Sequence, residues 1–244
     1  MNYDAHVSAV RREVSDLVTA FAAGPMDAPV PTCPEWTAQD LAQHVGDFSG
    51  FWAHVICEGT GRAKPEFPAM PGDAGVAEWI GEIGTTLCDQ LGATSPDQPM
   101  WSWVPGRENA AFAARRAANE LAVHRYDAQT CRGSAKPIDT SLAVDGIEEI
   151  FVMVEAWRAR DDRTGTGNGE TLCLQATDAD AAWVLCLTPD GTEVTRSAGD
   201  ADLTISGKAS DLELLLYQRP TIGAVTQDGD TSSLVAWYAA FHFG

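Results

Sequence analysis

The chain has 244 residues, of which 45% are hydrophobic and 21% charged, and its formal net charge is −19. This length suits two small domains, and the composition is that of a globular protein that can form a core without disulfides. Nucleic acid and anionic membranes are poor partners for so acidic a chain, because both carry negative charge.

The N-terminal segment MNYDAHVSAVRREVSD carries charges throughout and lacks the apolar run of a signal peptide. The longest apolar runs, such as residues 150–154, are too short to span a membrane. We therefore expect a cytoplasmic protein with reduced cysteines, each a small core residue rather than a nucleophile. The six cysteines form no C-x-x-C pair and are Cys33, Cys57, Cys88, Cys131, Cys173 and Cys186.

Four segments in the first part of the chain repeat apolar residues at helical spacing. Thr37 and Asp40 resemble a capping box at the start of the second segment. Glycine and proline predict loops at residues 23–36 and 59–73. This pattern predicts a four-helix bundle with a long crossover between its second and third helices. The predicted helices cover residues 4–23, 37–55, 76–91 and 108–131.

The later part of the chain begins with a fifth predicted helix at residues 140–158 and a polar linker at residues 158–170. The period then changes from 3.6 to 2, which predicts short strands, with Pro189-Asp190-Gly191 as a turn. Ser210 and Glu213 resemble a capping box before a short helix. The predicted strands cover residues 171–176, 182–188, 193–197, 202–206 and 224–227, and a last helix covers residues 232–241.

These elements predict a mixed fold of two domains. Residues 1–135 form the helical bundle, and residues 136–244 form a small α+β domain that includes the connecting helix at 140–158.

Glu120 and His124 are the first candidates for chemistry. They lie four residues apart in the fourth predicted helix, so their side chains share one face of it. Both lie close to the apolar stripe of that helix, where a carboxylate and an imidazole are costly to bury unless something compensates them. A metal ion would do so. The alternative is a chance spacing, with a core histidine satisfied by a carbonyl group.

His44 is the best candidate for a third ligand. It lies three residues after Leu41 and four before Phe48, so it faces inward from the second predicted helix. Three protein ligands leave a coordination position open, which is the catalytic rather than the structural arrangement. The competing histidines are His6, which lies at a helix start, His54, which is rotated about 80° around the helix from His44, and His242.

Two segments resemble a known family. VPTCPEWTAQDLAQHVGD at residues 30–47 and RRAANELAVHRYDA at residues 115–128 are similar to two motifs of the mycothiol-dependent maleylpyruvate isomerase family, a branch of the DinB-like bundles. The resemblance implies a sterol-carrier-like C-terminal domain, a divalent metal (zinc) held by the two histidines and the glutamate, and mycothiol as the thiol. It also implies that Arg219, in the segment LYQRP, lies beside the active site.

Four more residues are candidates near the metal. Arg116 lies four residues before Glu120 and is expected to bind a substrate carboxylate or to support that ligand. Asp127, three residues after His124, is expected to orient an imidazole or to pair with an arginine. Trp36 and Trp101 are expected to line the cofactor pocket, against the alternative that both are core residues. Arg219 is expected to contact both cofactor and substrate.

The favoured interpretation is an enzyme in which a metal-activated mycothiol thiolate is transferred to a small electrophile. One alternative is a maleylpyruvate cis–trans isomerase that uses mycothiol as its cofactor. Further alternatives are a metal-dependent hydrolase and a non-enzymatic thiol- or lipid-binding module. The expected partners are small molecules, and the expected assembly is a monomer or homodimer.

Overall fold

A computed structural model describes residues 1–61, 68–158 and 167–241 of the chain. The chain divides into two compact units, Met1–Ile138 and Asp139–Gly244. Within the described residues, no helix combines the length and the apolar character needed to cross a lipid bilayer.

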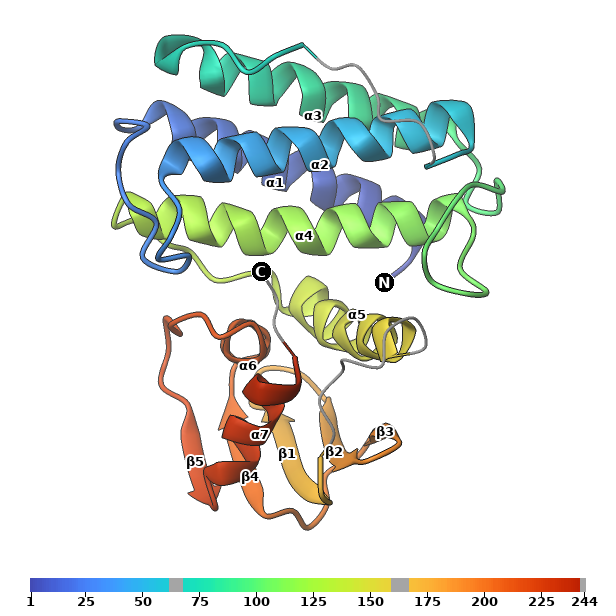
Figure 1. Cartoon of the computed structure of the whole chain (residues 1–244), viewed down its shortest axis with the longest axis vertical. Helices are drawn as coiled ribbons and strands as arrows, with labels where there is room; N and C mark the ends of the chain where they lie inside the picture. Colours follow the sequence, from blue (N-terminus) through green and yellow to red (C-terminus); the bar gives the residue numbers. More distant parts are fainter. Residues whose placement is uncertain (62–67, 159–166, 242–244) are drawn as a thin grey trace. The chain divides into compact units, whose positions relative to one another are not determined.

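The part of the first unit that the structure describes contains four long helices, α1 (Tyr3–Ala22), α2 (Ala38–Glu58), α3 (Val76–Ala93) and α4 (Ala110–Cys131), with a 3₁₀ turn at Asp73–Gly75. Figure 1 shows them side by side, and each packs against two others: α1 and α2 both contact α3 and α4. The predicted four-helix bundle is therefore confirmed. Residues 62–67 of the predicted loop at 59–73 lie outside the described residues.

Side-chain caps explain where the bundle helices begin. The Thr37 side chain accepts the Asp40 amide hydrogen bond, and the Asp40 carboxylate accepts that of Thr37, so the predicted capping box is present. Helix α4 begins two residues later than predicted, because Asn109 is its N-cap and accepts a hydrogen bond from the Phe112 amide. Helix α2 ends at Glu58 and is followed by the C-cap Gly59, whose φ of 71° favours glycine.

The described residues of the second unit form three helices and one five-stranded sheet of order β3-β2-β1-β4-β5. Strands β1 and β4 are parallel, and the other neighbouring pairs are antiparallel. The predicted α+β domain is therefore confirmed, although its sterol-carrier-like character stays a prediction. The elements are α5 (Thr140–Arg158), β1 (Glu170–Ala176), β2 (Ala182–Thr188), β3 (Gly191–Thr195), β4 (Leu203–Gly207), α6 (Ala209–Leu216), β5 (Thr226–Gly229) and α7 (Ser232–Ala240).

Three details of the second unit differ from the prediction. Strands β3 and β5 are each shifted by two residues, because edge strands of mixed polarity specify their register weakly. The predicted capping box of Ser210 and Glu213 is wrong, since α6 begins at Ala209 after an N-cap at Lys208 that makes no side-chain hydrogen bond. The Ala209 amide donates instead to the carboxylate of Asp178, at 2.8 Å. Residues 159–166 of the predicted linker lie outside the described residues.

Candidate metal centre

Helices α2 and α4 bring His44, Glu120 and His124 together. Glu120 Oε1 lies 3.2 Å from His44 Nε2 and 3.5 Å from His124 Nε2, and the two imidazole centroids are 4.6 Å apart. One donor atom from each residue lies within 4.8 Å of the other two. Among the described residues, this is the group of histidine, cysteine and acidic side chains with the geometry of a metal site.

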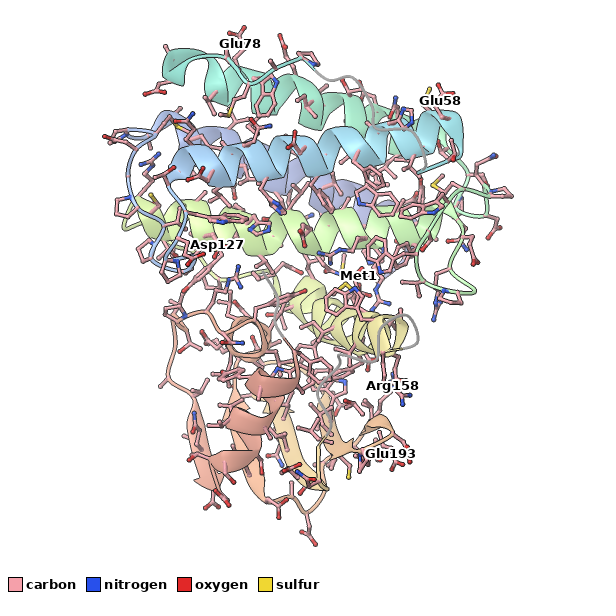
Figure 2. All side chains as sticks on the ribbon, viewed as in Figure 1. Met1, Glu58, Glu78, Asp127, Arg158 and Glu193 are labelled. Carbon is pink, nitrogen blue, oxygen red and sulfur yellow. The ribbon has the colours of Figure 1, made fainter. Side chains whose placement is uncertain are left out.

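Asp127 determines which nitrogen of His124 faces Glu120. Its Oδ2 lies 3.0 Å from His124 Nδ1, and the carboxyl group is fully buried. Because a carboxylate accepts, we assign the proton to Nδ1, which leaves the lone pair of Nε2 directed toward Glu120. Figure 2 labels Asp127 on α4. A carboxylate that holds the far nitrogen of a histidine is the usual support for a metal ligand.

Arg116 binds one oxygen of Glu120, and the other oxygen faces the histidines. Its guanidinium forms an ion pair with Glu120 Oε2 one helical turn away, and Oε1 is the oxygen near both imidazoles. The guanidinium carbon also lies 5.9 Å from the ring centroid of Phe48. Arg116 is buried, so this ion pair is not the solvent-exposed pair that the spacing alone allowed.

The imidazole of His44 is held neutral by its surroundings. Its pKa is lowered from the ordinary 6.5 to about 4, chiefly by burial and then by the electrostatic effects of His124 and Arg116, which outweigh the opposite effects of Asp47 and Asp127. A neutral imidazole has a lone pair available near pH 7, as a metal ligand must.

Trp36 lies beside both histidines. Its ring centroid is 5.2 Å from that of His44 and 6.2 Å from that of His124. Backbone hydrogen bonds fix the preceding loop, from the Val30 amide to the Trp36 carbonyl at 2.9 Å and from the Trp36 amide to the Cys33 carbonyl at 2.8 Å. The indole therefore lies against the candidate site, and its role in cofactor binding stays a prediction.

Trp101 lies in a different cluster. Its ring contacts among the described residues are with other aromatic side chains, at centroid distances of 5.7 Å from Phe51, 6.4 Å from Trp52 and 6.2 Å from Trp103. Its role in cofactor binding stays a prediction.

Two of the competing histidines, His6 and His54, do not belong to this group. His6 is buried on α1, and His54 lies on α2 with a buried Nε2. His242 lies outside the described residues. Arg219 belongs to the second unit, where its Nη1 donates to the Tyr217 carbonyl at 2.8 Å. Its place at the active site stays a prediction.

Cys33 is the neighbour of the site that the sequence interpretation missed. Its Sγ lies 3.7 Å from Asp127 Oδ2, the same oxygen that holds His124. Cys33 was expected to be a small core residue, but it is only partly buried. The sequence did contain one sign that Cys33 is near the site, because this residue lies within the segment VPTCPEWT, which carries the family resemblance.

The donor set fits a divalent metal such as zinc. Tetrahedral ligands at about 2.1 Å from one ion lie roughly 3.4 Å apart, which matches the two distances from Glu120 Oε1. Two neutral imidazoles and one carboxylate are typical ligands of a catalytic zinc ion. Such a set leaves at least one position for a substrate or thiol.

A helical bundle with this donor group between two of its helices, followed by an α+β domain, has the architecture of a metal-dependent bundle enzyme. A family model described as the mycothiol maleylpyruvate isomerase N-terminal domain matches residues 7–129, about half of the chain. The chain therefore belongs to this family, and the predicted class, an enzyme of the transferase or isomerase kind, is confirmed. The alternative of a non-enzymatic module is set aside.

Two solved structures share the fold. They are a crystal structure of the mycothiol-dependent maleylpyruvate isomerase and one of a histidine-to-alanine mutant of that enzyme. Each has a TM-score of 0.66 and 13% sequence identity, and the alignment covers 93% of this chain and 93% of the other. At this identity the likeness concerns the fold alone. A comparison with curated proteins finds no match.

Proposed function

We propose that the chain binds one divalent metal ion, zinc by its donor chemistry, through His44, Glu120 and His124, and uses mycothiol to isomerise a small conjugated electrophile. The observation that carries this proposal is the group of three donor atoms within 4.8 Å in a bundle of this family. It accounts for a carboxylate and two imidazoles that lie close together in a partly buried place.

A bound metal ion would lower the pKa of the mycothiol thiol. A free alkyl thiol has a pKa of about 8.5 and is mostly protonated at pH 7, whereas a thiol bound to a divalent cation loses its proton. The resulting thiolate adds reversibly to a conjugated double bond, which allows rotation about that bond before the thiolate leaves. No cysteine of the chain has to act as the nucleophile.

The side chains around the donors have separate tasks in this proposal. Asp127 keeps His124 in the tautomer that binds metal, and Arg116 neutralises the far oxygen of Glu120. Trp36 would cover part of the two imidazoles, beside which its ring lies. With a metal bound, less water would then compete with the thiol at the open coordination position.

Isomerisation has better support than the transfer reaction that the sequence alone favoured. The family model and the two fold relatives both carry the name of an isomerase. We propose a small anionic cis-configured conjugated acid as the substrate class, with maleylpyruvate as the first compound to test. Both reactions share the addition step, and they differ only in whether the thiol leaves again. We place the enzyme in the cytoplasm, where thiols stay reduced.

The deciding experiment is incubation of the metal-loaded protein with mycothiol and maleylpyruvate. Isomerisation predicts a trans product of unchanged mass, with mycothiol needed in catalytic amounts only. A stable product heavier by one mycothiol would identify a transferase instead. Turnover that requires metal but no thiol would support the hydrolase alternative and contradict the proposal.

Arg219 is proposed to hold the substrate carboxylate. A Schellman motif ends α6, with the Arg219 amide donating to the Leu214 carbonyl at 2.8 Å and the Gln218 amide to the Leu215 carbonyl at 2.9 Å. Gln218 takes the left-handed position with a φ of 60°. The guanidinium is buried and donates to the carbonyl of Tyr217. The backbone of Arg219 is therefore held by the end of α6, and its guanidinium would offer its remaining N–H groups to a carboxylate.

We predict that Arg219→Ala lowers turnover by about 30- to 1000-fold, because one charge-assisted contact contributes about 2–4 kcal/mol to the transition state. Arg219→Lys should recover only part of the rate, since it lacks the planar fork. Metal content should not change in either variant, because Arg219 is no ligand. Wild-type activity in Arg219→Ala, or loss of metal, would contradict this role.

A further inference from the structure

Cys33, Asp127 and His124 form a chain of polar contacts that ends at the candidate metal centre. Asp127 Oδ2 lies 3.7 Å from Cys33 Sγ, at the distance of a sulfur hydrogen bond, and 3.0 Å from His124 Nδ1. The thiol and the imidazole therefore share one oxygen of the Asp127 carboxylate.

Backbone hydrogen bonds fix the position of the loop that carries Cys33. The Cys33 amide donates to the Val30 carbonyl at 3.0 Å, and the Cys33 carbonyl accepts from the Trp36 amide at 2.8 Å. The loop is joined to the start of α2 by the Ala38 amide, which donates to the Ala28 carbonyl at 2.8 Å. The thiol position is therefore determined by the same turn that places Trp36 beside the histidines.

A fully buried carboxylate needs hydrogen-bond donors, because removing it from water is costly. A thiol is a weak donor, so it can orient Asp127 without drawing its charge away from His124. Loss of this contact would allow the carboxylate to rotate, and the imidazole that depends on it would lose its alignment.

We infer that Cys33 is a positioning residue for the metal centre: its S–H orients Asp127, which orients His124. This inference rests on the metal site of the proposed function, and it does not depend on the reaction. Cys33 touches neither metal nor substrate in this scheme, and it acts only through the aspartate.

Cys131 offers a matched control. It lies in the last turn of α4, four residues after Asp127, and its Sγ is 3.9 Å from the Ala28 carbonyl of the same loop. Like Cys33 it is partly buried. Cys131→Ala therefore removes a thiol between the loop and α4 and leaves the contact with Asp127 in place.

The experiment measures zinc affinity of the full chain by chelator competition, and the visible spectrum of the cobalt-substituted protein. Asp127→Asn should weaken zinc binding by about 10- to 100-fold, as loss of a carboxylate behind a histidine ligand does. Cys33→Ala should weaken it by about 3- to 10-fold and shift the cobalt bands. Cys33→Ser, which keeps a donor, should stay within about 2-fold of wild type, as should Cys131→Ala.

The double variant separates a positioning role from general loosening of the loop. If Cys33 acts through Asp127, Cys33→Ala should change affinity by less than about 2-fold in the Asp127→Asn background. Additive effects, a Cys33→Ser variant as weak as Cys33→Ala, or equal losses in Cys33→Ala and Cys131→Ala would each overturn the inference.

The outcomes also separate this inference from the proposed function. A wild-type chain that binds no zinc would overturn both the metal site and the role of Cys33. A wild-type chain that binds zinc but shows no thiol-dependent turnover would overturn the proposed reaction alone, and the affinities of the cysteine variants would still decide the role of Cys33.

Discussion

Two buried arginines of α4, Arg116 and Arg125, each pair with a glutamate, and they show how one helix serves both the site and the bundle. Arg125 is 3% exposed, and its Nε donates to Glu13 Oε2 of α1 at 2.8 Å. Its other nitrogens donate to Gln129 Oε1 at 3.0 Å and to the carbonyls of Lys136 and Pro137 at 2.6 and 3.3 Å. All three guanidinium nitrogens of Arg125 therefore have partners within the first unit.

The other pair, Arg116 with Glu120, is built differently. Arg116 pairs with one oxygen of Glu120 and lies against the ring of Phe48, while the second oxygen faces the histidines. Each arginine thus contacts one oxygen of its glutamate, and the difference lies in what surrounds the pair: Arg125 links α4 to α1 and to the chain that follows α4, whereas Glu120 presents its second oxygen to two imidazoles. The comparison teaches that an arginine–glutamate pair can join two helices of the bundle or can orient a carboxylate toward other ligands, according to its neighbours.

The largest expected effect is loss of metal from ligand variants. The difference between the two glutamates matters only if the group around Glu120 binds a metal ion. Removing one histidine of that group tests this. His124→Ala and His44→Ala should each lower zinc content below half an equivalent and remove nearly all turnover, since only two protein donors remain. Elemental analysis of dialysed protein measures this. Full zinc content in both variants would mean that the donors do not hold the metal.

The next effect is on stability and separates the two arginines directly. Arg125→Met should destabilise the metal-free protein by about 3–5 kcal/mol, because Glu13 is left buried without its partner. Arg116→Met should cost less, about 1–2 kcal/mol, since the Glu120 side chain is 17% exposed and can reach water. Urea denaturation of both variants gives the comparison. Equal losses would show that Arg116 is a structural residue like Arg125.

A smaller effect concerns pH. The pKa of His44 is about 4 in the folded protein, below the 6.5 of an unperturbed histidine. Between pH 6.5 and pH 4 the unfolded chain therefore binds the extra proton, so the stability of the metal-free protein falls as pH falls through this window. His44→Gln should show a shallower decline of melting temperature over the same range. Proton NMR should find the His44 midpoint near 4, and a midpoint above 6 would contradict this environment.

The smallest effect is on thiol labelling. Burial raises the pKa of Cys88 to about 11, whereas Cys57 is exposed. At pH 8 an alkylating reagent should therefore modify Cys57 well before Cys88 in the native protein. Under denaturing conditions without reductant all six thiols should react, as the predicted absence of disulfides requires. A pair of protected thiols would indicate a disulfide.

The candidate ligands could be predicted because their geometry is mostly local. Glu120 and His124 are one helical turn apart, and their alignment follows from the period of α4. His44 followed from the apolar stripe of α2, where Leu41 and Val45 are buried. The predictions were wrong where the sequence pattern was short. Ser210 and Glu213 matched a capping pattern, but the Asp178 side chain from the β1–β2 connection caps α6 instead.

The amino-acid sequence alone determined the helices of the bundle, the change to strands after the fifth helix, and the choice of two histidines and a glutamate, because hydrophobic period and residue chemistry act within a few residues. Only the tertiary structure decided which oxygen of Glu120 is available and which nitrogen of His124 faces it. It also brought Cys33 to Asp127 across 94 positions and Glu13 to Arg125 across 112. Such contacts depend on how loops and helices pack together, and no local period encodes them.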